Sequence, residues 1–250
     1  MKSSRFTVER VRPLTADTIE LTLSGDASAI AAPGQFVNIA LPGYFLRRPI
    51  SVCDWTPDKL CLLIRVVGAG TRALADAAPG TELDILSGLG NGFDLSALSG
   101  VAPDNVILAG GGIGIAPLYG LAKALKRQGA TPVAALGFRN RADAFYLDEF
   151  RAVCDTLIVT EDGSLGERGL VTDLLRRHSA RTYVFCCGPS PMLRAVWNLP
   201  HLTGGQYSFE ARMGCGFGAC MGCSMPFRDG WKRVCKDGPV FFREEIAWET

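Results

Sequence analysis

Four cysteines between residues 215 and 235 have the spacing of iron–sulfur ligands. They are Cys215, Cys220, Cys223 and Cys235, and they form a C-x4-C-x2-C-x11-C pattern. Thiolate is the usual protein ligand of iron–sulfur clusters, and C-x4-C-x2-C…C is the spacing of plant-type [2Fe–2S] sites. Glycines, which let a backbone approach an inorganic core closely, surround the first three cysteines at positions 214, 216, 218 and 222. The pattern predicts a centre that passes single electrons. Four thiolates also suit a structural zinc ion, so a zinc-binding scaffold protein is an alternative.

Two glycine turns have the features of a phosphate-binding site. Residues 110–117 read GGGIGIAP and follow an apolar run, and Cys187-Gly188-Pro189 follows another. A glycine turn between strand and helix exposes free N–H groups at the helix N-terminus, and these attract phosphate. Ligands of open α/β sheets lie beyond the carboxyl ends of the strands, so we expect both turns to flank one nicotinamide nucleotide. The candidate contacts are Gly111, Gly112, Gly114, Pro117, Cys187, Gly188 and Pro189. Pro117 occupies a position where the strict dinucleotide fingerprint has glycine or alanine, so an ordinary βα turn is the alternative.

Two segments among the first hundred residues offer groups for a second nucleotide. The run Arg48-Pro49-Ile50-Ser51 presents a guanidinium for phosphate oxygens and a hydroxyl for a ring nitrogen. The run Leu63-Ile64-Arg65 precedes Gly70 and Thr71, whose N–H groups suit a pyrophosphate. The alternatives are an arginine at a solvated strand edge and a Thr71 side chain that caps the next helix.

Composition argues against several other functions. The 26 basic and 25 acidic side chains nearly cancel, so no field favours nucleic acid. The two histidines, His178 and His201, belong to no recognisable constellation, and we assign no catalytic acid or base. No run approaches the roughly 20 apolar residues that span a bilayer, and the start MKSSRFTVERV lacks the apolar core of a signal peptide. We therefore expect neither a nucleic acid nor a membrane as partner, and a cytoplasmic location.

The elements that must position these residues form three groups. Residues 1–100 contain alternating apolar and polar runs such as TIELTLSG, which predict an antiparallel β-barrel with one short helix at TRALADAA. Residues 101–205 alternate apolar strands such as NVILAGG and PVAALGF with helices, which is typical of a Rossmann-like parallel α/β domain. Residues 206–250 are rich in glycine and cysteine and show no regular pattern, and they are predicted to form a small iron–sulfur subdomain.

The order of these motifs resembles the ferredoxin-reductase superfamily. Within it, the chain is similar along essentially its whole length to the electron-transfer subunits of bacterial NAD-dependent dihydroorotate dehydrogenases. The segments that carry the resemblance are RRPISV with the following CD, the GxGT of residues 68–71, LGNGF, AGGGIGIAPL, TEDGS and VCKDGPVF.

The resemblance implies three cofactors and one partner. FAD would contact the 48–51 and 63–65 segments together with Gly70 and Thr71, and the four cysteines would hold one [2Fe–2S] cluster. The partner would be an FMN-containing catalytic subunit that oxidises dihydroorotate in pyrimidine biosynthesis, in a heterotetramer of two plus two subunits. Electrons would pass from that FMN through the cluster and FAD to NAD⁺.

Two further alternatives concern the ends of this electron path. Arg139 and Arg141 follow the predicted strand PVAALGF, near the position where an acidic residue favours NAD, and arginine there can admit a 2′-phosphate. The resemblance implies NAD, with NADP as the alternative. At the other end, the same cofactors can serve a reductase module for another acceptor, such as ferredoxin, hydrogenase or a sulfide-linked enzyme.

Overall fold

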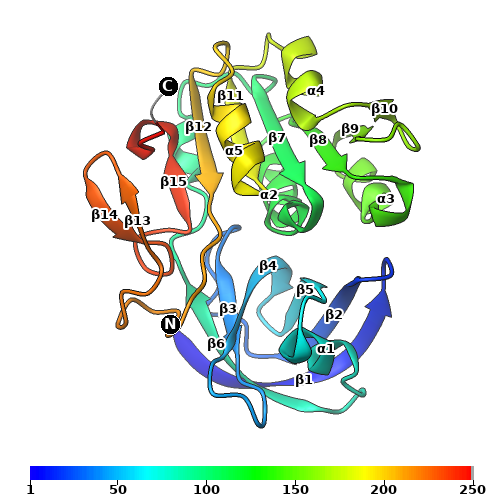
Figure 1. The fold of residues 1–250 in the computed structure, drawn as a ribbon, viewed down its shortest axis with the longest axis vertical. Helices are drawn as coiled ribbons and strands as arrows, with labels where there is room; N and C mark the ends of the chain where they lie inside the picture. Colours follow the sequence, from blue (N-terminus) through cyan, green and yellow to red (C-terminus); the bar gives the residue numbers. More distant parts are fainter. Residues whose placement is uncertain (249–250) are drawn as a thin grey trace.

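Six strands form a closed antiparallel barrel in the computed structural model, which describes residues 1–248 (Figure 1). Their order around the barrel is β1-β2-β5-β4-β3-β6, and α1 (Ala69–Ala75) connects β5 to β6. In β6, Leu83 and Ile85 are buried whereas Glu82 and Asp84 are exposed, because successive side chains of a strand point to opposite faces. The strands are β1 (Lys2–Pro13), β2 (Thr18–Gly25), β3 (Phe36–Ile39), β4 (Arg48–Thr56), β5 (Lys59–Arg65) and β6 (Glu82–Leu89).

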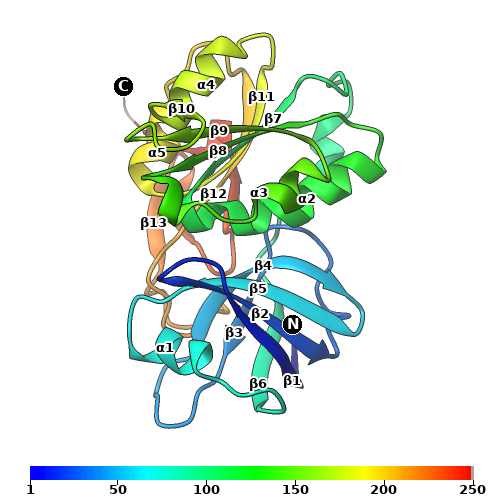
Figure 2. The ribbon, with the colours of Figure 1, turned by 90° about the vertical axis from the view of Figure 1, so that its right-hand side faces the viewer.

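A seven-stranded sheet above the barrel has the order β10-β9-β8-β7-β11-β12-β15 (Figure 2). All neighbouring strands are parallel except β12 and β15. Every residue of β7 and β11 is buried, as expected for strands covered on both faces. The core residues of α2 and α3 belong to one side of the sheet, and those of α4 and α5 to the other. The strands are β7 (Val106–Gly111), β8 (Val133–Phe138), β9 (Asp155–Thr160), β10 (Glu167–Arg168), β11 (Tyr183–Cys187), β12 (Gly204–Ser208) and β15 (Val240–Phe242). The helices are α2 (Ile115–Arg127), α3 (Leu147–Arg151), α4 (Val171–Arg177) and α5 (Ser190–Trp197). The predicted combination of a barrel with a Rossmann-like sheet is confirmed.

The segment after β12 is more regular than its sequence indicated. It contains a hairpin of β13 (Ser224–Phe227) and β14 (Gly230–Arg233), and β15 then joins the edge of the large sheet. In Figure 1 this segment, drawn in orange and red, runs beside both the barrel and the sheet. Strands of three or four residues are too short to show a period, which explains why the sequence shows no regular pattern there. The predicted division at 205/206 falls inside β12, and the three-part division stays a prediction.

The barrel and the sheet are joined by a buried polar network. Glu20 of β2 is 4% exposed, and its carboxylate accepts hydrogen bonds from Arg10 (2.7 Å), Arg12 (2.6 Å) and the Tyr146 hydroxyl (2.9 Å). Arg12 also donates to Glu149 of α3 at 3.1 Å. Burial raises the pKa of Glu20, but the hydrogen bonds from Arg12 and Tyr146 outweigh it and hold the pKa below its usual value.

We expect Tyr146→Phe to lower the free energy of unfolding by about 1–2 kcal/mol, because one hydrogen bond to a buried carboxylate is lost while the ring packing is kept. Urea denaturation measures the change. Tyr44→Phe is the control, since no hydrogen bond of the Tyr44 hydroxyl is present in the described part of the chain. An equal effect of both substitutions would contradict the role of this contact.

The same network predicts a dependence of stability on pH. The folded-state pKa of Glu20 is depressed, so its contribution to stability is present above the unfolded-state pKa of 4.5 and is lost as the pH falls through the folded-state pKa. Glu20→Gln removes this titration, so the variant should be less stable at neutral pH and should lose less stability on acidification. Urea denaturation midpoints between neutral and acidic pH test this, and parallel curves for both proteins would exclude it.

Among the residues that the structure describes, no helix combines the length and the apolar character needed to cross a lipid bilayer.

Candidate functional site

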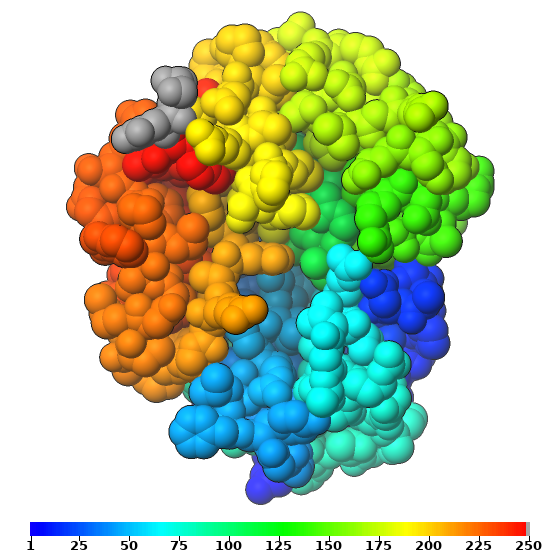
Figure 3. All heavy atoms as spheres, in the orientation of Figure 1, coloured from blue at the N-terminus to red at the C-terminus, as the bar shows by residue number. Residues whose placement is uncertain are grey.

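The barrel-side cavity lies where the barrel, the large sheet and the segment after β12 meet. Its volume is about 470 Å³, and it opens on the face drawn in Figure 3, between the cyan barrel loops and the orange segment. Its walls include every predicted nucleotide-binding residue except Arg48 and Gly70. The barrel contributes Pro49, Ile50, Ser51, Leu63, Ile64, Arg65 and Thr71, and the sheet contributes Gly111, Gly112, Gly114, Pro117, Cys187, Gly188 and Pro189. Two motif sets predicted separately from the sequence therefore face one space.

Arg48 and Gly70 lie together outside this wall. The Arg48 guanidinium lies over the Tyr44 ring at 4.6 Å and so close to Gly70 that a Cβ at position 70 would clash with it. Thr71 lines the cavity and also stabilises α1. Its Oγ1 accepts hydrogen bonds from the N–H groups of Val67 (2.9 Å) and Gly68 (3.2 Å), so Thr71 is the third residue of the helix and not its N-cap.

The cavity has the character of a flavin site. Its barrel wall is mostly apolar, and within residues 1–248 the Ser51 hydroxyl forms no hydrogen bond. An apolar slot with a free hydroxyl and a nearby guanidinium suits a flat ring system that carries a phosphate-linked tail.

The first glycine turn brings the start of α2 against the second turn. Strand β7 ends at Gly111, a single 3-10 turn covers Gly112–Gly114, and α2 begins at Ile115, with Pro117 in its first turn. A Cβ at Gly114 would lie 2.5 Å from the carbonyl oxygen of Cys187 and 2.6 Å from the Cα of Gly188, so only glycine permits this approach. The start of this 13-residue helix, with Gly114, Ala116 and Pro117, thus lines the cavity beside the second turn, where helix N–H groups can attract phosphate.

Two titratable side chains of this wall, Cys187 and Glu210, have pKa values that burial raises. Burial, assisted by the charge of Glu210, raises the pKa of Cys187 to about 12, so Cys187 is a neutral thiol near pH 7. The Glu210 side chain has contact with solvent, yet the surrounding walls desolvate its carboxyl group and raise its pKa.

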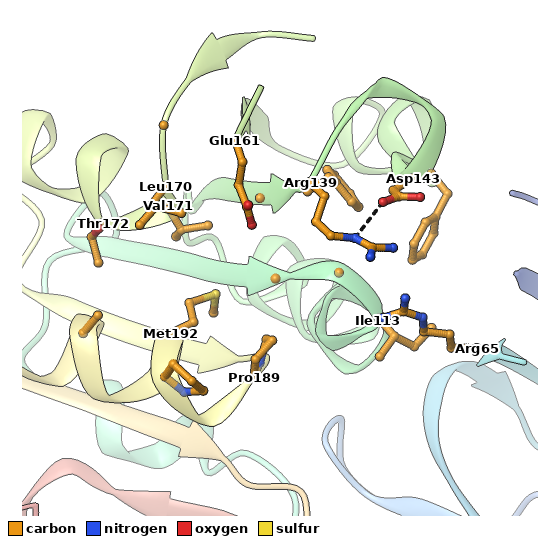
Figure 4. Close-up of a pocket in the computed structure, with 18 of the residues that line it drawn as sticks. Arg65, Ile113, Arg139, Asp143, Glu161, Leu170, Val171, Thr172, Pro189 and Met192 are labelled. Atoms are coloured by element: carbon orange, nitrogen blue, oxygen red, sulfur yellow. Dashed lines mark hydrogen bonds and ion pairs between the residues drawn. The ribbon is translucent and has the colours of Figure 1, made fainter. Parts of the chain in front are cut away.

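A second space, the sheet-edge cavity, lies at the carboxyl ends of β7, β8 and β9 (Figure 4). Its volume is about 400 Å³. Apolar walls come from side chains that include Ile113, Val171 and Met192, and charged groups come from Asp17, Arg65, Arg139, Asp143 and Glu161. The residues common to both cavities are Arg65, Gly111, Gly112, Ile113 and Pro189. The glycine turn and one guanidinium therefore lie at the junction, as an extended dinucleotide with a central pyrophosphate would require.

The four predicted cluster cysteines are arranged as two pairs. The thiols of Cys215 and Cys220 interact with each other, as do those of Cys223 and Cys235. Backbone N–H groups point at the sulfurs: Ala219 and Cys220 donate to Cys215 Sγ at 3.2 and 3.4 Å, and Cys235 donates to Cys223 Sγ at 3.4 Å. Within the described residues, no three metal-ligating side chains converge as ligands of one ion.

This donor set fits a [2Fe–2S] cluster. The cluster takes four thiolates, and hydrogen bonds to the sulfurs stabilise their charge. Although burial opposes it, hydrogen bonds from the backbone N–H groups of Phe217, Cys220 and Ala219 lower the pKa of Cys215 to about 6. Two thiol pairs with N–H groups aimed at them provide the ligand chemistry that such a cluster needs.

The cysteine loop is attached directly to the barrel-side cavity. Asn38 of β3 donates to the carbonyl oxygen of Cys215 at 3.0 Å, and Asn38 is paired across the strands with Pro49 of the cavity wall. Met213, two residues before Cys215, lines the cavity, and so does Pro239, four residues after Cys235. A cluster held by these cysteines would therefore lie next to whatever the cavity binds.

Sequence reasoning missed several lining residues. Phe36, Glu210, Met213 and Pro239 belong to the barrel-side cavity, and Asp17, Thr18, Val171 and Met192 belong to the sheet-edge cavity. Met213 and Pro239 could have been found from their closeness to the cysteines, whereas nothing in the local sequence marks Asp17 or Val171.

Comparison with known proteins gives matches over all parts of the chain. Residues 210–247 match the iron–sulfur cluster binding domain of dihydroorotate dehydrogenase B, and residues 108–198 match the oxidoreductase NAD-binding domain. The chain is 42% identical over 253 residues to the "dihydroorotate dehydrogenase B (NAD(+)), electron transfer subunit" of Geobacillus kaustophilus (strain HTA426), with 97% of this chain and 98% of the relative covered. A protein of the same description from Fusobacterium nucleatum is 37% identical, with both chains fully covered.

Solved structures of other proteins share the fold of this chain. The structure of an NADH-dependent reduced ferredoxin-NADP oxidoreductase superposes with a TM-score of 0.86 at 29% identity and covers 97% of this chain and 90% of that one. A ferredoxin NADP⁺ reductase from Neisseria gonorrhoeae, with FAD and NADP bound, reaches a TM-score of 0.69 at 18% identity over 82% of this chain and 93% of that one, which shows a shared fold.

Proposed function

Because the chain belongs to the family of dihydroorotate dehydrogenase B electron transfer subunits, we propose that it carries electrons from a dihydroorotate-oxidising partner subunit to NAD⁺ by way of a [2Fe–2S] cluster and FAD. One observation carries the proposal for this chain. The barrel motif, the glycine turns and the cysteine loop, which lie far apart in the sequence, all border the barrel-side cavity. An electron carrier needs its cofactors close enough for electrons to pass between them, and a cavity bordered by all three segments would bring them that close.

Different residues bind the cluster and FAD. Cys215, Cys220, Cys223 and Cys235 hold the cluster, and the backbone N–H groups around them tune its potential. The residues that line the cavity and hold FAD are Pro49, Ile50, Ser51, the 63–65 segment and Thr71, whereas Arg48 and Gly70 lie beside them outside that wall. When bound, FAD exchanges hydride with a nicotinamide and single electrons with an iron–sulfur centre. The chain supplies binding, orientation and tuning, which agrees with the absence of an assigned catalytic acid or base.

The nicotinamide nucleotide is proposed to span both cavities. Its nicotinamide end would lie in the barrel-side cavity against Cys187, Gly188 and Pro189, beside the flavin. Its pyrophosphate would lie on Gly111, Gly112 and Gly114 at the start of α2, with Arg65 across the junction. Its adenosine would enter the sheet-edge cavity, whose apolar walls suit a flat base.

The partner is proposed to be an FMN-containing subunit, in an assembly of two copies of each chain located in the cytoplasm. Support comes from the names of the relatives, which describe them as one subunit of a larger enzyme. The mass of the complex purified from cells that express both chains, together with its flavin content, tests this composition.

A reductase module for another acceptor is less well supported. The chain is 42% identical to electron transfer subunits of dihydroorotate dehydrogenase B but 29% identical to the ferredoxin-NADP oxidoreductase of similar fold. The paired thiols with their N–H donors, together with the family match, also favour the cluster over structural zinc.

The proposal is tested in two steps. The anaerobically purified chain should contain FAD, iron and inorganic sulfide, and NADH should bleach its flavin absorption. With the partner added, dihydroorotate should reduce NAD⁺. A colourless protein that contains zinc and no flavin would exclude the cofactor assignment. A chain with FAD and cluster that supports no dihydroorotate-dependent NAD⁺ reduction would exclude the assignment of the partner.

A further inference from the structure

Asn38 is a polar side chain of the barrel that holds the cysteine loop, residues 214–223. It lies in β3 and is 1% exposed, and its Nδ2 donates to the carbonyl oxygen of Cys215 at 3.0 Å. In Figure 1 the orange loop approaches the barrel beside β3. Gly216 is buried against the same amide, because a Cβ at position 216 would lie 2.4 Å from the Asn38 Nδ2. The loop therefore contacts Asn38 with its backbone.

The backbone of Asn38 is fixed on both sides. It is paired with Pro49 of β4 on one side and with β6 on the other. Its carbonyl oxygen accepts a hydrogen bond from Arg47 at 3.3 Å, and Arg47 forms an ion pair with Asp84 of β6 at 2.9 Å. Because Asn38 is anchored in this way, its side chain does not follow a shift of the loop but restrains it.

The other half of the Asn38 amide has no partner. Its Oδ1 is buried and forms no hydrogen bond within residues 1–248. A buried acceptor without a donor opposes folding, and this cost offsets what the single bond to Cys215 contributes. Asn38 therefore adds little to the stability of the fold, and its distinct contribution is the position that it gives to Cys215.

The bond of Asn38 connects the two proposed cofactor sites. Asn38 lies two residues along β3 from Phe36, which lines the barrel-side cavity, and its strand partner Pro49 lines the same cavity. On the loop side, the carbonyl group that accepts the bond belongs to Cys215 itself, a proposed cluster ligand. One amide thus links the wall of the flavin site to the backbone of a cluster ligand.

We propose that Asn38 is a positioning residue for electron transfer between FAD and the cluster, because its amide fixes the backbone of Cys215 relative to the barrel-side cavity. The rate of transfer depends on how closely and how reproducibly the two groups are held. The same bond keeps the neighbouring N–H groups directed at the Cys215 sulfur, and such hydrogen bonds set the reduction potential of a cluster. The inference deepens the proposed function and rests on it.

Asn38→Ala tests this role through properties of the cluster. The anaerobically purified variant should keep its FAD and the wild-type rate of flavin reduction by NADH. The onward reduction of the cluster, followed by stopped-flow absorbance, should be about tenfold slower, which is a fraction of what a misplacement of about 1 Å costs in an active site. The reduction potential of the cluster should fall, because less well directed N–H groups stabilise the added electron less, and its EPR spectrum should change.

Asn38→Val separates positioning from stability. Valine suits a strand, and it leaves neither a donor nor an unpaired buried acceptor at this position. The variant should resist urea as well as the wild-type protein does, and yet show the same slow cluster reduction and lower potential as Asn38→Ala. A residue with a merely structural role would not give this combination.

Asn105→Ala is the matched control. Asn105 lies just before β7, outside the lining of both cavities, and its side chain also holds a distant backbone segment. Its Nδ2 donates to the hydroxyl of Thr182 at 2.9 Å, and its Oδ1 accepts from the N–H of Thr182. Loss of both bonds should lower the resistance to urea, whereas the rate of cluster reduction, the potential and the EPR spectrum should stay at their wild-type values.

The possible failures are distinguishable. If both Asn38 variants show the wild-type rate of cluster reduction and the wild-type potential, Asn38 does not position the cluster. If they lose FAD and cluster together with their resistance to urea, the role of Asn38 is structural only. If the wild-type protein itself contains neither FAD nor cluster, the proposed function fails, and this inference fails with it.

Discussion

Cys215→Ala is expected to remove the iron–sulfur cluster while leaving FAD in place. The Cys215 sulfur receives several backbone N–H groups and is paired with Cys220, so its loss removes one of the four proposed ligands. Iron and inorganic sulfide should fall from roughly two atoms of each per chain to background. Reduction of the flavin by NADH should persist, because the flavin and glycine-turn residues are unchanged, but dihydroorotate-dependent NAD⁺ reduction by the complex should stop.

Cys154→Ala is the control for this substitution. Cys154 is a partly buried free cysteine that precedes β9, outside the cysteine loop and both cavities. It should keep full iron, sulfide and activity. Full cluster content in Cys215→Ala would show that the ligands are other residues.

Gly114→Ala should have the second largest effect, on nucleotide binding. The added methyl group would lie 2.5 Å from the Cys187 carbonyl oxygen and 2.6 Å from the Cα of Gly188, and these are backbone atoms that cannot rotate away. The start of α2 and the second turn must separate, so overpacking should cost about 1–3 kcal/mol of stability. Because phosphate contacts depend on accurate placement, we expect the Kd of ADP-ribose to rise by about a hundredfold, by analogy with the cost of a misplacement of about 1 Å in an active site.

Gly129→Ala is the control that separates a loss of stability from a loss of nucleotide affinity. Gly129 lies just beyond the other end of α2, has a φ of +82°, and would have no atom within 4 Å of an added Cβ. Gly129→Ala should lower the free energy of unfolding by about 1 kcal/mol, because alanine is strained in a left-handed backbone conformation. It should leave nucleotide affinity unchanged. Urea denaturation and calorimetry measure both quantities. If Gly114→Ala binds ADP-ribose as Gly129→Ala does, the glycine turn does not hold the pyrophosphate.

The features that sequence predicted well are those with a local physical signature. The continuous apolar runs NVILAGG and PVAALGF reflect burial on both faces, and the strands β7 and β8 that they predicted are confirmed. The cysteine pattern was readable because the four cysteines and their glycines lie within a short segment. Both glycine turns were readable because they follow apolar strands directly.

The features that sequence missed depend on contacts between distant residues. Asn38 is one polar residue in a four-residue strand, and its contact with the Cys215 carbonyl spans 177 positions. The sheet-edge cavity combines side chains from separate strands, loops and helices, and none of them is distinctive alone. The proximity of Arg139 to the ribose stays a prediction, and its ion pair with Asp143 became visible only in three dimensions.

The pairing of β15 with β12 has a consequence for biosynthesis. The barrel and the parallel strands precede β15 in the sequence, and domains generally fold as they leave the ribosome. Yet Pro239 forms part of the cavity wall, and the side chain of Asn91 holds Val240 by donating to its carbonyl oxygen at 2.7 Å and accepting from its N–H at 3.1 Å. These contacts exist only after residue 240 has been synthesised. A nascent chain therefore presents an incomplete pocket until residue 240 has been synthesised and has left the ribosome, so we expect stable loading of the flavin to follow that point.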